Sequence, residues 1–268
     1  MGQYYSKLFQ SKNIGINQIE NYLDKVPFEH ILDENMKDMM EGMPTQDELQ
    51  HVLGKLKDNK SPGCDGLPVE FYRKFWFCLK EKYMMVLQEC YEIEVLPNST
   101  RTSVLAAIFK SNNNQLLDNY RPLSLSNTDY KIVAFVFAER MKSIMEYIIN
   151  PDQTAGVKGR NIVCSIRNLL DIYEYCEESK APGGLLLADY KKAYDSLEHN
   201  FMFAVLKRLN FGPVMLKWIK ILYNDAKFII KNNGWLSRSY DIQRGIRQGC
   251  PVSVSCFIIV VEVLRHYD

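Results

Sequence analysis

The chain has 268 residues, of which 47% are hydrophobic and 24% charged, a composition typical of a soluble globular protein that excludes disorder as its main state. Its formal net charge of +1 indicates no particular partner, although nine acidic side chains and four lysines in residues 1–50 leave a mild basic bias in the remainder. The longest apolar run, at 256–261, is far shorter than the roughly 20 residues of a membrane-spanning helix, so no membrane partner is expected.

The seven cysteines form no Cys-x-x-Cys pair, and the four histidines stand at no metal-ligand spacing relative to them. This pattern favours reduced thiols in an intracellular protein, in the nucleus or the cytoplasm, and argues against a zinc site. Nothing in the sequence indicates an oligomer.

Helices dominate the predicted elements of the first half. Residues 1–44 are acidic and helical in character, and we interpret them as a connecting segment. Thr45 and Glu48 match a capping box that opens a helix, and Pro68 suits the first turn of a second helix. Residues 101–110 then predict a strand.

The second half alternates strand and helix signals. A continuous apolar run at 184–189 is typical of a buried strand, and residues 228–242 predict a hairpin that turns at Asn233 and Gly234. Because there are no internal repeats, these elements are expected to form one continuous α/β body. Apolar periodicity predicts further helices at about 129–149, 161–176, 196–210, 213–225 and 251–264.

Asp189 is the first candidate for chemistry, because it ends the predicted buried strand. A carboxylate in that position is costly unless something compensates it, and a magnesium ion does so well. The alternative is that Asp189 lies in a turn and that Asp195 or Ser196 caps the next helix. The residues alone favour neither interpretation.

The loop at 243–251 places two arginines, Arg244 and Arg247, beside Gln248 and Gly249 ahead of a helix. Such side chains could contact phosphates and a sugar hydroxyl at a helix N-terminus. Glycine-rich loops with arginine are also common on protein surfaces, so this loop alone is weak support for a site.

Two further loops carry basic residues. Arg121 precedes a proline, which favours extended backbone from which its guanidinium can reach outward. Lys158 and Arg160 lie in a glycine-bearing loop before a predicted helix. Each loop taken alone is more typical of a solvated surface than of a ligand site.

Taken in order, the segments resemble the reverse transcriptase of non-long-terminal-repeat (LINE-type) retrotransposons over about residues 45–264. Several specific motifs in one register make a stronger argument than any one of them. The matching segments are KDNKSPGCDGLPVEFYRKFW, DNYRPLSLSNTDYKI, INPDQTAGVKGRNI, LLADYKKAYDSLEHNFM, NFGPVMLKWIKILYND and IQRGIRQGCPVSVSCFIIVVEVL.

The resemblance implies an α/β (α+β) fold of the right-hand polymerase kind, with residues 45–184 as fingers and 185–268 as an incomplete palm, without a thumb. It implies an RNA-directed DNA polymerase that binds an RNA template, a DNA primer and deoxynucleoside triphosphates. Chemistry in the family uses two Mg²⁺ ions about 3.5–4 Å apart.

The resemblance also implies residue roles. Asp189 would be the first metal-binding carboxylate, helped by the backbone carbonyl of Tyr190, and Tyr194 would be the aromatic gate that excludes a ribose 2′-hydroxyl. Gln248 and Gly249 would lie along the incoming nucleotide and the template, and Arg121 near the nucleotide phosphates. Nucleic-acid contacts are expected from Lys158, Arg160, Arg244 and Arg247.

The family completes its metal site with an Ala-Asp-Asp box, and no such sequence occurs in this chain. We therefore expect that the polypeptide alone binds magnesium weakly and does not polymerise in a primer-extension assay. We also expect the palm sheet to lack its central hairpin, which would leave an open edge and exposed apolar surface. The alternative hypotheses are a non-catalytic nucleic-acid-binding remnant, in which Asp189 is idle, and a decayed element without a role.

Overall fold

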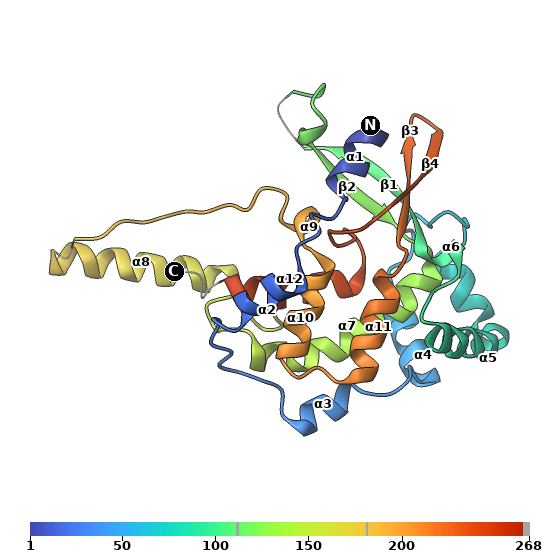
Figure 1. Cartoon of the computed structure of the whole chain (residues 1–268), viewed down its shortest axis with the longest axis horizontal. Coiled ribbons are helices and arrows are strands. Elements are labelled where there is room, and N and C mark those ends of the chain that lie inside the picture. Colours follow the sequence, from blue (N-terminus) through green and yellow to red (C-terminus); the bar gives the residue numbers. More distant parts are fainter. Residues whose placement is uncertain (111–112, 181, 265–268) are drawn as a thin grey trace.

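The computed structural model describes residues 1–110, 113–180 and 182–264, so the last four residues of the predicted palm range lie outside the described part. A sheet lies at one end of a helical body, the top in Figure 1, and a long helix projects from the body to the left of that view. The strands are β1 (Thr102–Phe109), β2 (Tyr120–Leu125), β3 (Lys227–Asn232) and β4 (Trp235–Asp241). The longer helices are α4 (Gln46–Lys55), α5 (Val69–Ile93), α7 (Thr128–Ile148), α8 (Ile162–Ser179), α10 (His199–Arg208), α11 (Pro213–Tyr223) and α12 (Pro251–Leu264). The shorter ones are α1 (Gly2–Leu8), α2 (Ile16–Leu23), α3 (Glu34–Met40), α6 (Asn98–Arg101), α9 (Ala193–Ser196) and the 3-10 turn η1 (Leu117–Asn119).

The sheet combines two antiparallel hairpins through one parallel pairing. Its strand order among the described residues is β2-β1-β3-β4, in which β1 and β3 are parallel and the outer pairs antiparallel. Asn233 and Gly234, with φ of 47° and 84°, join β3 to β4, which confirms the predicted hairpin. The other hairpin sets Arg121 on β2 opposite Ile108 on β1.

The core lies among the helices below the sheet. Helix α7 is buried on almost every side and packs against α12, whose sequence is apolar all round. Phe137 of α7 and Trp218 of α11 are fully buried, with ring centroids 5.2 Å apart. The helices predicted at 129–149 and 251–264 are therefore confirmed, and so is the α/β class.

Residues 1–44 are part of this core. Ile19 and Leu23 of α2 and Met40 of α3 are buried in the same apolar cluster as α7 and α12. Tyr5 of α1 belongs to a second cluster under the sheet. The predicted division into a connecting segment, fingers and palm therefore crosses a shared core, and its boundaries stay a prediction.

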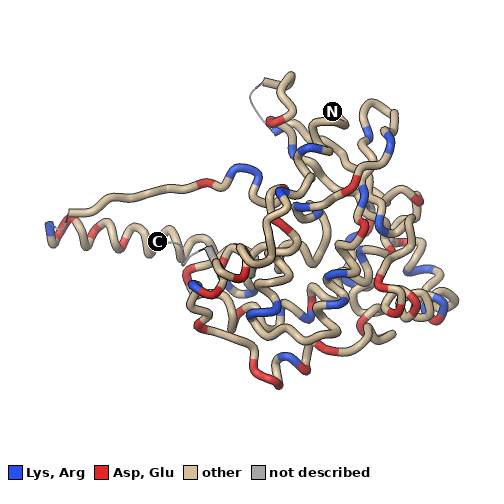
Figure 2. The backbone as a smooth tube through the Cα atoms, viewed as in Figure 1, with Lys and Arg blue, Asp and Glu red and all other residues tan. Residues whose placement is uncertain are grey.

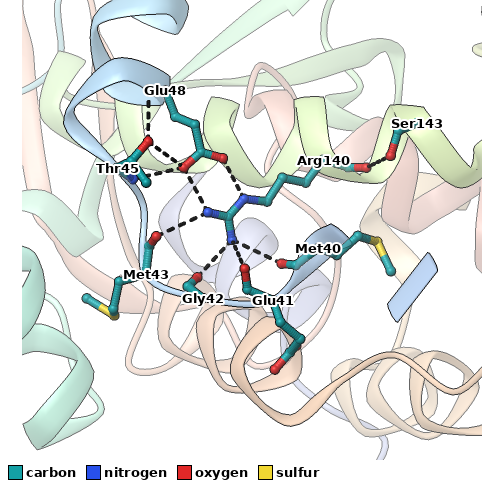
Figure 3. Close-up of polar contacts among 8 residues, drawn as sticks. All are labelled: Met40, Glu41, Gly42, Met43, Thr45, Glu48, Arg140 and Ser143. Atoms are coloured by element: carbon teal, nitrogen blue, oxygen red, sulfur yellow. Dashed lines mark hydrogen bonds and ion pairs between the residues drawn. The ribbon is translucent and has the colours of Figure 1, made fainter. Parts of the chain in front are cut away.

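An arginine on α7 ties the segment before α4 to the helical body (Figure 3). Arg140 donates from Nε and Nη2 to the two carboxylate oxygens of Glu48 at 2.7 and 2.8 Å. Its remaining hydrogen bonds go to the backbone carbonyls of residues 40–43. Thr45 caps α4 through the amide of Glu48, whose carboxylate accepts in return from the Thr45 amide, as the capping box predicts.

The predicted buried strand at 184–189 is wrong. This segment is extended but pairs with no strand among the described residues, and it leads back from the tip of α8 to α9 (Figure 1). Leu185, Leu186 and Leu187 are 64%, 89% and 82% exposed, and α8 buries no residue. An apolar run becomes a strand only beside another strand with free backbone groups, and none lies here.

Helices long and apolar enough to cross a bilayer are absent from the described ranges.

Candidate nucleotide-binding cleft

A cleft of about 450 Å³ opens between the β1–β2 hairpin and the helical body. Its walls come from three separate parts of the chain: the hairpin, α9 with the residue before it, and the loop before α12 with the first turn of that helix. Four cationic side chains and two carboxylates line it, so its local charge is positive although the whole chain is almost neutral. The lining residues with charge are Lys110, Asp118, Arg121, Lys192, Asp195 and Arg247.

Basic and acidic residues are interspersed over most of the chain (Figure 2). The positive character of the cleft is therefore a local feature and could not be inferred from the charge of any long segment.

The loop at 243–250 is held in place from two sides by backbone hydrogen bonds. The amides of Gly245 and Ile246 donate to the carbonyls of Leu197 and Tyr194 at 2.6 and 2.8 Å. On the other side, the Ser124 amide on β2 donates to the Gln248 carbonyl at 2.9 Å. These bonds bring the predicted residues Tyr194, Gln248, Gly249 and Arg121 to one cleft.

Gly249 has the left-handed φ of 108°, and a Cβ at this position would lie 3.1 Å from the Ser124 carbonyl oxygen. The loop can approach β2 this closely because the residue is glycine. Arg121, next to Pro122 on the same strand, is exposed at the cleft edge.

Tyr194 forms part of the cleft wall and is stacked on Phe257 of α12, with ring centroids 4.2 Å apart and planes at 18°. An aromatic ring held in this way cannot easily swing aside. It lines the cleft together with Gln248 and Asp195.

Arg247 is 1% exposed, which the sequence did not indicate. Its guanidinium carbon lies 4.4 Å from the centroid of the Tyr130 ring, and Nη2 donates to the Arg101 carbonyl at 2.9 Å. Nε and Nη1 are buried without a hydrogen-bond partner among the described residues. A buried cation with free donors in a cleft wall adds to the attraction for an anion.

Asp195 is a cleft residue that sequence reasoning considered only as a helix cap. It is 4% exposed and accepts a hydrogen bond at 3.0 Å from Nε2 of Gln248. It does not cap α10, whose N-cap is Glu198 and has no side-chain cap bond. Burial raises the pKa of Asp195, while the Gln248 hydrogen bond and the Lys192 charge lower it. Its position directly after Tyr194 was the available signal.

Lys192 and Asp118 form an ion pair at the mouth of the cleft, with Nζ 2.5 Å from Oδ1. Tyr4 of α1 hydrogen-bonds both groups, and Lys191 adds a longer contact of 3.7 Å to Asp118. The bonds from Lys192 and Tyr4 lower the pKa of Asp118 to about 2. The pair joins the β1–β2 hairpin to the segment before α9.

Asp189 and Tyr190 do not line this cleft, and both are exposed on the extended segment. No group of three or more histidine, cysteine or carboxylate side chains that could hold a metal exists in the described ranges. The residues present therefore do not fit a complete magnesium site, and we derive no step through a metal ion.

Of the other three predicted nucleic-acid contacts, one is exposed and two are engaged in hydrogen bonds with the protein. Lys158 is exposed. Arg160 donates to the carbonyls of residues 146, 149, 150 and 153 and so caps the C-terminal end of α7. Arg244 donates to the Leu8 carbonyl at 2.9 Å and pairs with Glu198 at 3.7 Å.

Comparison of the sequence with known proteins identifies the family to which the chain belongs. Residues 108–267 match the family described as reverse transcriptase (RNA-dependent DNA polymerase). The chain is 34% identical over 259 residues to the transposon TX1 uncharacterized 149 kDa protein of Xenopus laevis, covering 97% of this chain and 20% of that protein.

Two retrotransposon Pol polyproteins are also similar to the chain. The type-1 element R1 protein of Bradysia coprophila is 24% identical, with 81% of this chain and 22% of that protein covered. The type-2 element R2DM protein of Drosophila melanogaster is 21% identical, with 77% and 19% covered. The chain thus spans about a fifth of the length of these relatives, and it belongs to the reverse transcriptase family, as a domain related to the Pol proteins of non-long-terminal-repeat retrotransposons.

Proposed function

We propose that this chain provides the nucleotide-binding cleft of an RNA-directed DNA polymerase, and that a deoxynucleoside triphosphate binds between the β1–β2 hairpin and the loop at 243–250. The observation that carries the proposal is the convergence of Arg121, Tyr194, Gln248 and Gly249 on one cleft of positive local charge. The triphosphate would meet the cations, and the sugar would lie against Tyr194.

The β1–β2 hairpin would then belong to the fingers, and α9 with the loop at 243–250 to the palm. An RNA template and a DNA primer would lie along the same face, with Lys158 as an exposed phosphate contact. Members of the family use divalent metal ions. The family resemblance assigns Asp189 and the Tyr190 carbonyl to that role, but both lie outside the cleft in this structure and do not make a metal site by themselves.

The first experiment measures the affinity of the chain for a deoxynucleoside triphosphate by isothermal titration calorimetry. Arg121→Ala is expected to weaken binding by about 10- to 100-fold, because it removes a charge-assisted hydrogen bond worth roughly 1.5–3 kcal/mol. Part of this loss should disappear at high salt, which screens the phosphate charge in the wild-type complex.

Arg238→Ala is the matched control, because Arg238 is an exposed arginine on β4 that packs over the Tyr240 ring at 5.4 Å and does not line the cleft. The Arg238→Ala variant should bind the deoxynucleoside triphosphate with the same affinity as the wild type. Absence of nucleotide binding by the wild type, or an equal loss in both variants, would contradict the proposal.

Tyr194→Ala is expected to reduce the preference for deoxyribonucleoside over ribonucleoside triphosphates, because the ring would otherwise collide with the 2′-hydroxyl. The ratio of the two dissociation constants should fall by about 10-fold or more, since steric exclusion by a fixed ring exceeds one van der Waals contact. Tyr194→Phe keeps the ring and should keep the ratio. If the ratio of the two dissociation constants were unchanged in Tyr194→Ala, Tyr194 would not contact the sugar.

A second candidate function is nucleic-acid or nucleotide binding without catalysis, and the exposure of Asp189 outside the cleft favours it. Asp189→Ala separates the two functions. Binding of template, primer and nucleotide should survive the change under either function, whereas template-dependent primer extension by any form of the protein should vanish if Asp189 is catalytic.

A further inference from the structure

Two side chains from different parts of the chain meet at the inner wall of the cleft. Gln248, in the loop before α12, donates from Nε2 to Oδ1 of Asp195 in α9 at 3.0 Å. Asp195 is 4% exposed, whereas Gln248 is half-buried and borders the open cleft. The pair therefore joins a buried carboxylate to an amide that a ligand can reach.

The chemistry of the pair decides how the amide is turned. An ionised carboxylate only accepts hydrogen bonds, so Gln248 must present its NH₂ group to Asp195. The side-chain amide is planar, and its oxygen Oε1 then points away from Asp195. Within the described ranges Oε1 accepts no hydrogen bond from the protein.

The backbones that carry both side chains are fixed. The Tyr194 carbonyl accepts from Ile246, and the Gln248 carbonyl accepts from Ser124 on β2. Gly245 packs directly on the Asp195 backbone, where a Cβ would lie 2.9 Å from the carbonyl oxygen. The remaining freedom of Gln248 is in its side-chain torsions, and the bond to Asp195 restricts them.

We infer that Asp195 is a positioning residue, which fixes the Gln248 amide so that Oε1 faces the cleft and accepts a hydrogen bond from the sugar 3′-hydroxyl of a bound nucleotide. The inference rests on the proposed nucleotide-binding function and adds to it the residue that sets the polarity of the Gln248 contact. An amide turned the other way would offer NH₂ to the cleft and would favour a different partner, such as a phosphate oxygen.

The test compares a deoxynucleoside triphosphate with its 2′,3′-dideoxy analogue, which lacks the 3′-hydroxyl, by calorimetric titration at about pH 8. The wild type should prefer the deoxynucleotide by about 3- to 10-fold, the value of one neutral hydrogen bond. Asp195→Ala should lose most of this preference, and the measured quantity is the ratio of the two affinities, because removing a cleft carboxylate changes the attraction for both triphosphates alike.

A double-mutant cycle separates positioning from a general structural role. Gln248→Ala should lose the preference by itself, and adding Asp195→Ala to it should change the preference no further, because Asp195 acts through Gln248. Asp195→Asn should show an intermediate loss of about 2-fold, since an asparagine amide can both accept from and donate to Gln248.

The remaining outcomes distinguish a failure of the proposed function from a failure of the inference about Asp195. Absence of deoxynucleotide binding by the wild type contradicts the proposed function, whereas equal wild-type affinity for the two nucleotides contradicts only the inference. An unchanged preference in Asp195→Ala overturns the inference, as does an additional loss in the double variant. If circular dichroism shows that Asp195→Ala does not fold, Asp195→Asn decides, and an unchanged preference in that variant overturns the inference too.

Discussion

Replacing Arg140 with alanine is expected to lower the free energy of unfolding by about 3 kcal/mol, because the change leaves the partly buried Glu48 carboxylate without its partner. The same change removes the donors that serve the carbonyls of residues 40–43, which connect α3 to α4. Chemical denaturation followed by circular dichroism measures the loss.

Lys142→Ala on the same helix is the control, because Lys142 is 50% exposed and pairs with Glu139 at 2.5 Å. An exposed ion pair of this kind contributes less than about 1 kcal/mol. Arg140→Lys should resemble Arg140→Ala more than the wild type, since a lysine cannot bridge two carboxylate oxygens and four carbonyls. Similar losses in Lys142→Ala and Arg140→Ala would show that the network is not specific.

The same network predicts a dependence on pH. Burial raises the pKa of Glu48, but the hydrogen bonds from Arg140 and Thr45 outweigh it, and the net pKa lies below the usual value of 4.5. A carboxyl with a lowered pKa contributes stability that is present above its unfolded-state pKa and is lost as the pH falls through the folded-state pKa. The difference in unfolding free energy between the wild type and Arg140→Ala should therefore become smaller as the pH falls below 4.5, the usual pKa of a glutamate.

Elements with a local signal were predictable from the sequence. The capping box of Thr45 and Glu48 and the turn at Asn233 and Gly234 depend on residues within four positions of each other, and both are present. The helices α7, α10, α11 and α12 also match the predicted ranges within a few residues, since apolar periodicity reports a buried face directly.

The segment at 184–189 shows what a local signal cannot supply. Its leucines have the composition of a buried strand, but burial depends on a neighbouring strand, and periodicity carries no information about one. The same limit applies to α8, whose apolar residues predicted a helix correctly but not that the helix would project from the body (Figure 1).

The candidate site was predictable in part. The residues Arg121, Tyr194, Gln248 and Gly249 came from the resemblance, and the fold places them at one cleft. Asp195 was missed because its burial depends on the loop at 243–250, whose Gln248 is 53 residues away in sequence. The role of Arg160 as a template contact stays a prediction, but its hydrogen bonds to carbonyls at the C-terminal end of α7 could not be predicted, because they depend on where that helix ends in space.

Gly245→Ala is expected to lower the free energy of unfolding by about 3 kcal/mol and to abolish nucleotide binding. Gly245 has a φ of +81°, which costs a residue with a side chain roughly 1–2 kcal/mol. Its Cβ would also lie 2.9 Å from the Asp195 carbonyl oxygen and 3.1 Å from its Cα, so backbone must move, at a further cost of roughly 1–3 kcal/mol. The movement would separate the loop from α9 and break the bond from Gln248 to Asp195.

Gly159→Ala carries the backbone strain without the close contact, because Gly159 has nearly the same φ, +79°, and a Cβ there would meet nothing within 4 Å. Its loss of stability should be limited to that strain of roughly 1–2 kcal/mol, and its nucleotide affinity should equal that of the wild type. Thermal and chemical unfolding measure the stabilities, and calorimetric titration measures binding. If the two alanine variants lost equal stability, the close approach of the loop to α9 would not be what holds Gln248 in the cleft.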